Sequence, residues 1–96
     1  MNLADATHKL FDEVVGDSFT IDAENVNAVK LVAVEAKTSQ EGAQRIPFVL
    51  TFHGPAEVLL EQGIYVLEHE KLGELEIFLV PVSEDGNQVA YEAVFN

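Results

Sequence analysis

The fold is decided by residues 63–96, GIYVLEHEKLGELEIFLVPVSEDGNQVAYEAVFN, because two turn signals divide this segment into strands. Each signal is a short stretch that ends in glycine, first Lys71-Leu72-Gly73 and then Glu84-Asp85-Gly86. Three-residue hairpin loops commonly end in a glycine with a left-handed backbone conformation, which other residues resist. We therefore predict a β-meander in which each strand pairs with the next.

The two predicted loops also determine which side chains face each other. The first loop sets Leu67 opposite Ile77, and the second sets Leu79 opposite Tyr91. A two-residue turn at Asp85-Gly86 would instead exchange the two faces, because side chains alternate along a strand. The three-residue loops agree on one inner face, which is predicted to hold Tyr65, Leu67, His69, Leu75, Ile77, Leu79, Tyr91, Ala93 and Phe95.

The opposite face of this meander is also apolar over much of its length. Part of it has to be covered by the N-terminal helix, by closure of six strands into a small barrel, or by a second subunit. We favour a compact six-stranded antiparallel barrel or sandwich with the helix packed on it. The apolar side chains of this outer face are Ile64, Val66, Phe78, Val80, Ala90 and Val94.

The first half of the chain supplies the remaining elements. Apolar residues at helical spacing predict a short N-terminal α-helix that Asn2 or Asp5 can cap and that ends at Gly16. Three strands are predicted at residues 17–22, 28–36 and 46–52, and His53-Gly54-Pro55 is expected to end the last of them. We therefore expect a mainly β fold in a single globular domain that spans residues 1–96. The apolar face of the helix is predicted to hold Leu3, Thr7, Leu10, Phe11 and Val14.

The composition narrows the choice of partners. Seventeen acidic residues against five basic ones give a formal net charge of -12, which opposes contact with nucleic-acid phosphates and with anionic membrane surfaces. We expect a protein partner, no direct nucleic-acid contact and no membrane contact. The chain holds no cysteine, which excludes disulfides and thiolate zinc sites. The start MNLADATHKLF lacks the basic and apolar parts of a signal peptide, so a cytoplasmic location, or one within a larger assembly, is expected.

Four glutamates gather at the tip of the first predicted hairpin. The register sets Glu70 opposite Glu74 and Glu68 opposite Glu76, and like charges directly opposite each other cost up to about 1 kcal/mol. Such a cluster would attract a cation or a basic partner surface, but the alternating ligands of a calcium loop are missing. Solvated carboxylates, offset by Lys71, are the simpler interpretation. No metal ion or other cofactor is predicted.

The histidines and serines offer little for catalysis. His53 and His69 could share a metal ion with one carboxylate, yet no His-x-x-x-His or comparable spacing is present. Hydrogen-bonded histidines at the rim of the sheet are the simpler interpretation. No serine lies in a glycine-flanked elbow and no glycine-rich phosphate loop occurs, so we do not expect an enzyme. Tyr65 and Tyr91 are expected to pack in the core rather than to bind a ligand.

One sequence pattern resembles a known family. The pattern runs from Gly54-Pro55 through GIYVLEH at 63–69, Leu72-Gly73 and FLVPV at 78–82 to YEAVFN at 91–96. Over residues 46–96, and more loosely before them, the chain is similar to a family of small bacterial proteins that is classed only as a domain of unknown function. The resemblance implies no catalytic residues, and it implies an accessory role in a phage-tail-like or secreted assembly.

Together these features predict a non-enzymatic protein-interaction or assembly module. Its partner is expected to be a protein, which includes a second copy of this chain. The alternatives are an acidic binding protein that targets a basic partner, such as a nucleic-acid mimic or an inhibitor, and a small metal-binding protein. The residues expected to bind the partner are Val66, Phe78 and Val80 of the outer face and Glu68, Glu70, Glu74 and Glu76 of the hairpin tip.

Overall fold

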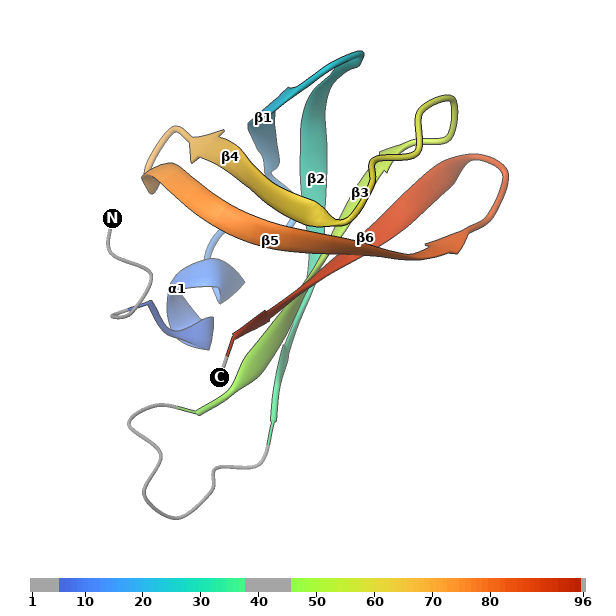
Figure 1. Ribbon diagram of the computed structural model, residues 1–96. Helices are drawn as coiled ribbons and strands as arrows, with labels where there is room; N and C mark the ends of the chain where they lie inside the picture. The colour runs from blue at the N-terminus through green and yellow to red at the C-terminus, as the bar shows by residue number, and fades with distance from the viewer. Residues whose placement is uncertain (1–5, 38–45, 96) are drawn as a thin grey trace.

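The computed structural model describes residues 6–37 and 46–95, which form one closed barrel with a short helix (Figure 1). The order of strands around the barrel is β1-β2-β3-β6-β5-β4, and all neighbouring strands are antiparallel. This confirms the mainly β class and selects the barrel from the two predicted architectures. The elements are α1 (His8–Asp12), β1 (Ser18–Ala23), β2 (Val26–Ala36), β3 (Phe48–Pro55), β4 (Gly63–His69), β5 (Gly73–Glu84) and β6 (Gln88–Phe95).

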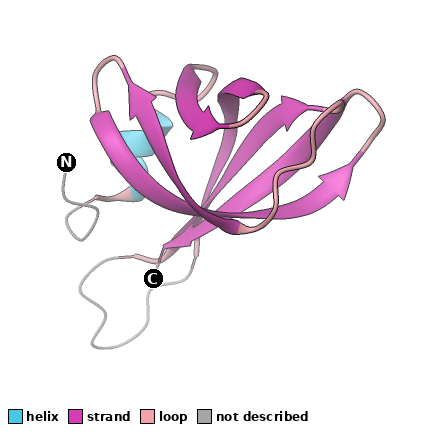
Figure 2. Ribbon diagram, turned by 45° about the horizontal axis from the view of Figure 1, so that its top comes forward, coloured by secondary structure: helices cyan, strands magenta, loops and turns pink. Residues whose placement is uncertain are grey.

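The barrel consists of two three-stranded meanders, β1-β2-β3 and β4-β5-β6, that join along both sides. The longer junction is between β3 and β6, whose register runs from the pair Phe48 and Phe95 to the pair Pro55 and Gln88. The shorter junction pairs β1 with β4 at Ile21 and Leu67. Figure 2 shows the strands curving around the barrel with α1 to one side. Closure gives every strand a neighbour on both sides, although the β1–β4 junction is short, with only the pairs Thr20–Glu68 and Ile21–Leu67.

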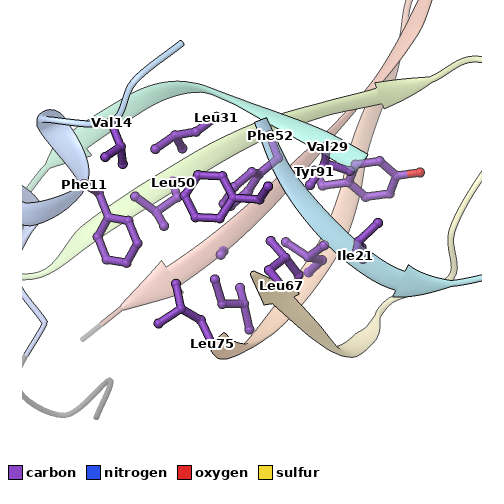
Figure 3. Close-up of a cluster of buried hydrophobic side chains, with 14 of the residues drawn as sticks. Phe11, Val14, Ile21, Val29, Leu31, Leu50, Phe52, Leu67, Leu75 and Tyr91 are labelled. Atoms are coloured by element: carbon purple, nitrogen blue, oxygen red, sulfur yellow. The ribbon is translucent and has the colours of Figure 1, made fainter. Parts of the chain in front are cut away.

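The core lies inside the barrel because apolar residues alternate with polar or less buried ones along the strands. In β3 every second residue from Phe48 to Gly54 is buried, and the residues between them are half-buried. Figure 3 shows side chains from several strands meeting in this interior. The predicted inner face of the C-terminal meander is confirmed for Leu67, His69, Leu75, Ile77, Leu79, Tyr91, Ala93 and Phe95, whereas Tyr65 is only half-buried.

Different segments of the chain cover the two ends of the barrel. At one end the fully buried ring of Phe11 in α1 packs 5.8 Å from the rings of both Phe48 and Phe95, measured between centroids. At the other end the hydroxyl of Tyr91 accepts a 2.9 Å hydrogen bond from the backbone N–H of Leu60, which is itself buried. The helix therefore seals the core, and the connection between β3 and β4 seals it on the far side.

The N-terminal helix is shorter than predicted. Helix α1 covers only His8–Asp12 and starts after Thr7, whose side chain makes no capping hydrogen bond. Beyond the helix the chain continues in tighter turns, in which the N–H of Val14 bonds to the carbonyl of Phe11. Gly16 ends this segment with a φ of 97°, as its position in the sequence indicated. The predicted contributions of Asn2, Leu3 and Asp5 lie outside the described residues.

The first hairpin keeps the predicted faces but not the predicted partners. Its loop is the three residues 70–72, so Gly73 pairs with His69 as the first residue of β5 and has a φ of 76°. This moves every pair by two residues and sets Leu67 opposite Leu75 rather than Ile77. Because side chains alternate with a period of two, a shift of two leaves the inner face unchanged.

The second hairpin reaches the predicted faces by another route. The N–H of Asp85 bonds to the carbonyl of Gln88, so the loop is the two residues Gly86 and Asn87 rather than Glu84-Asp85-Gly86. Gly86 has a φ of 90°, which suits the first central position of a type II′ turn. The pairing with β6 then shifts between Pro81 and Ser83, where β5 carries one extra residue. The two-residue turn alone would exchange the inner and outer side chains of β5 relative to β6. The extra residue of the bulge restores the predicted inner face.

The first half of the chain also departs from the predicted boundaries. Strand β2 begins at Val26, because a tight turn with Asn25 at a φ of 65° replaces the wider polar connection. The tripeptide His53-Gly54-Pro55 does not end β3, since Gly54 pairs with Val89 and the strand runs to Pro55. A Cβ at Gly54 would lie 3.2 Å from Cε2 of Tyr91, so glycine here allows the Tyr91 ring to approach the strand rather than breaking it.

Candidate protein-interaction surface

An apolar patch lies on the outside of the barrel over β4, β5 and β6, the segments coloured from yellow to red in Figure 1. Ile64 pairs with Phe78, and Val80 pairs with Glu92. Val94 lies two residues beyond Glu92 on β6, and therefore on the same face as Phe78 and Val80. We call this set the outer patch, and its members are Ile64, Val66, Phe78, Val80 and Val94.

The most exposed members of the outer patch are large. Ile64 is 69 % exposed, Val94 62 % and Phe78 51 %, whereas Val66 and Val80 are half-buried. Sequence reasoning selected Phe78, Val66 and Val80 for partner binding, and the structure places Ile64 and Val94 on the same face with higher exposure. A cross-strand pair such as Ile64 and Phe78 also stabilises the sheet, but its outer surface remains free. Contiguous exposed apolar surface is a common feature of interaction sites.

Helix α1 does not cover the outer patch. Its buried residue Phe11 contacts the inward-facing rings of Phe48 and Phe95, and its other apolar residue, Leu10, packs against the same core. Of the three ways to cover the outer face that the sequence left open, the helix is therefore excluded for the exposed residues of the patch. Closure of the barrel does not cover these residues either, because it buries the inner face of the sheet and leaves the outer face exposed to solvent.

The four glutamates of the first hairpin lie next to the outer patch. Glu68 is directly opposite Glu74, Glu76 is opposite Val66 of the patch, and Glu70 lies in the turn. We call these four residues the acidic tip. The predicted pairs, Glu70 with Glu74 and Glu68 with Glu76, are wrong because the register is shifted by two residues. All four side chains are exposed, and none of them forms an ion pair with any residue in 6–37 or 46–95.

His69 anchors the acidic tip to the start of β1. Its Nε2 lies 2.9 Å from Oδ2 of Asp17, and its Nδ1 accepts the backbone N–H groups of Lys71 at 3.0 Å and Leu72 at 3.3 Å. The ring centroid is 4.8 Å from that of Phe19. Because Nδ1 accepts, Nε2 carries the ring N–H and donates a hydrogen bond to the Asp17 carboxylate. Both nitrogens are engaged, so His69 is a structural residue, as the prediction of a hydrogen-bonded rim histidine stated.

Sequence reasoning did not find Asp17, the partner of His69. The two residues are 52 positions apart, and no local pattern relates them. Asp17 precedes β1, and its backbone carbonyl also accepts the N–H of Leu31 from β2. The contact exists because the β1–β4 junction of the barrel brings the start of β1 to the tip of the first hairpin.

His53 lies apart from His69 and on the other face of the sheet. It is half-buried on the outer side of β3, where it pairs with Lys30 of β2 and Ala90 of β6. His69, in contrast, points to the barrel interior. Within the described ranges 6–37 and 46–95, no three His, Cys, Asp or Glu side chains are grouped so that they could hold a metal ion.

The two tyrosines hold the connection between β3 and β4. The hydroxyl of Tyr65 donates a 2.6 Å hydrogen bond to the carbonyl of Glu61, and the hydroxyl of Tyr91 lies 3.5 Å from the carbonyl of Val58. Burial raises the pKa of Tyr65, and the negative charge of Glu61 raises it further. Tyr91 is a core residue with a polar end, as predicted, whereas Tyr65 is a partly buried packing residue.

Comparison with known proteins places the chain in a family without assigning it an activity. Among the described residues, no helix is long and apolar enough to cross a membrane. Searches of the curated proteins and of the solved structures give no match. A family model described as "Domain of unknown function (DUF6916)" matches residues 6–95, which is almost the whole chain. The chain therefore belongs to the DUF6916 family.

Proposed function

We propose that this protein is a non-enzymatic interaction module that binds a partner protein through the outer patch and the adjacent acidic tip. The observation that carries this proposal is the exposure of Ile64, Phe78 and Val94 on one face of a closed barrel. Large apolar side chains that lie exposed next to one another on a folded surface are typical of sites that bind a partner protein. In the outer patch, three of the large exposed apolar side chains of the described residues lie next to one another.

The charge around the patch favours a basic partner over a second copy. The acidic tip adjoins the patch through the pair Val66 and Glu76, and Glu92 adjoins it through Val80. A second copy would also carry a net charge of -12, and the like charges would repel each other. A partner with an apolar centre and a rim of lysine or arginine fits both features. An accessory role in a phage-tail-like or secreted assembly, which the resemblance of residues 46–96 implies, would supply such a protein surface.

Quantitative capture from a lysate of the native host tests this proposal. The wild-type protein is compared with I64S/F78S, which removes the apolar centre, and with L59S as a matched control. Leu59 is 58 % exposed on the connection between β3 and β4, outside the patch. We expect one protein to be captured by the wild type and by L59S but lost with I64S/F78S, and unchanged circular dichroism in all three.

Two results would contradict parts of this proposal. If the three baits capture the same proteins in equal amounts, the outer patch is not the binding surface. If the captured complex keeps its affinity when salt is raised from 50 to 500 mM, on the order of a threefold decrease in Debye length, the acidic tip does not contribute to binding. Sedimentation of the purified wild type over a range of concentrations tests whether the partner is a second copy of this chain. A mass that rises to that of a dimer would favour self-association over binding to a different protein.

A further inference from the structure

A second feature lies on the other meander, where an open groove of about 490 Å³ crosses the outer surface of β1, β2 and β3. Asn87 of the β5–β6 turn and Gln88 at the start of β6 form one wall of the groove. The small side chain of Ala28 in β2 leaves room along its length. The groove shares no residue with the outer patch or the acidic tip, so its role is independent of the proposed function.

Three hydrogen-bond donors stand in a row in this groove because of the strand register. Ser18 of β1 pairs with Lys30 of β2, and Lys30 pairs with His53 of β3. Adjacent strands lie about 4.8 Å apart, so the three residues span about 10 Å on one face. In residues 6–37 and 46–95, none of the three side chains has a hydrogen bond or an ion pair. A hydroxyl, an ammonium and an imidazole N–H together can donate to the two oxygens of one carboxylate.

The charges near the groove disfavour a ligand that carries more than one negative charge. Hydrogen bonds from the backbone N–H groups of Asn87 and Gln88 lower the pKa of Asp85, and the nearby His53 lowers it further. Asp85 is therefore a carboxylate close to the His53 end of the row. This charge, together with the net charge of -12, repels a phosphate dianion or a polyanion more strongly than a monoanion.

The groove also has apolar walls beside its donors. Val32 of β2 and Pro55 of β3 line it next to Lys30 and His53. A ligand that binds here therefore combines an acidic group with a short apolar body. We propose that this groove binds an organic monocarboxylate, with Ser18, Lys30 and His53 holding the carboxylate and Val32 and Pro55 contacting the apolar body. A free carboxylic acid and the C-terminus of an apolar peptide share this chemistry.

Titration of the ¹⁵N-labelled protein followed by NMR tests the proposal. The probes are 4-methylpentanoate as a free acid, N-acetyl-Leu-Leu with a free C-terminus as a peptide, 4-methylpentanamide as the uncharged analogue, and inorganic phosphate. We expect saturable shifts of the amides of Lys30, His53 and Gly54 with at least one carboxylate. The K30Q variant should weaken binding about tenfold, because a hydrogen bond to a charged group is lost. The K71Q variant, which removes an exposed lysine from the hairpin turn, should leave the affinity unchanged.

The four probes separate the outcomes. Saturation with the free acid alone, or with the peptide alone, identifies the source of the carboxylate. The proposal is overturned if neither carboxylate saturates these amides, if 4-methylpentanamide binds equally well, or if K30Q binds as the wild type does. Tighter binding of phosphate than of either carboxylate would overturn the assignment of the ligand class. Because K30Q changes an exposed residue, its amide spectrum away from the groove shows directly that the fold is retained.

Discussion

The inner and outer faces of β5 carry similar residues in very different surroundings. On the inner face Leu79 is fully buried and Ile77 is 1 % exposed, whereas Phe78 between them is 51 % exposed. Apolar content alone therefore does not separate core from surface in this strand. The difference shows that the inner residues stabilise the barrel, while the outer ones are free to contact another molecule.

The largest effect should come from opening a cavity on the inner face. Replacing Leu79 with alanine should lower the free energy of unfolding by about 2 to 5 kcal/mol, because the barrel cannot collapse around the lost side chain. Replacing Phe78 with alanine should change it by about 0.5 kcal/mol or less, since that side chain is half exposed. Urea denaturation of both variants measures the difference. Equal losses would mean that the outer patch belongs to the core.

The inner rim should show the next largest effect. Replacing His69 with alanine leaves the N–H groups of Lys71 and Leu72 without their acceptor and Asp17 without its donor. We expect a loss of about 1 to 3 kcal/mol in the free energy of unfolding and faster amide exchange in the turn. The matched variant H53A on the outer face should lose about 0.5 kcal/mol or less. If H53A proves the more damaging, His69 is not the residue that anchors the hairpin.

The two strand glycines of β3 and β4 offer a smaller contrast. A Cβ at Gly54 would lie 3.2 Å from Cε2 of Tyr91 and 3.4 Å from Cγ1 of Val29, whereas a Cβ at Gly63 would have no neighbour within 4 Å. Replacing Gly54 with alanine should cost about 1 kcal/mol through overpacking. Replacing Gly63 with alanine should be neutral or stabilise by about 0.4 kcal/mol or more, because it restricts the unfolded chain. Thermal unfolding that ranks the two variants in the opposite order would contradict the close packing of Tyr91.

The smallest effect should arise on the outer face, at the acidic tip. Replacing Glu68 with lysine turns its repulsion with Glu74 into attraction and should stabilise the protein by about 0.2 to 1 kcal/mol. The gain should shrink as salt is added, because the pair is exposed. The variant E57K, on the connection between β3 and β4, controls for the general change in net charge. An equal gain in E57K would assign the effect to net charge rather than to the cross-strand pair.

Much of the candidate surface could be predicted from the sequence, because side-chain alternation is a local property. The alternation of side chains predicts Val66, Phe78 and Val80 on the outer face, and they lie there although both hairpin registers differ from the prediction. The register of the first hairpin differs from the prediction by two residues, an even number. In the second hairpin the turn alone would shift the register by an odd number, and the extra residue of the bulge near Val82 makes the total shift even. The prediction of which side chains face inward and outward is therefore correct, because only a shift by an odd number of residues exchanges the two faces. The predicted pairs of glutamates are wrong, because the partner of each residue depends on the register itself.

The sequence by itself determined the class of fold, the inner face and the acidity, since these follow from composition and from residue periods of two. Only the tertiary structure decided which meander edges join, and therefore where distant residues meet. Closure through β3–β6 and β1–β4 brings Asp17 to His69 and leaves the outer patch exposed. The pairing of β1, β2 and β3 aligns Ser18, Lys30 and His53 in one groove. These contacts depend on the order and register of whole strands, which no local pattern of residues encodes.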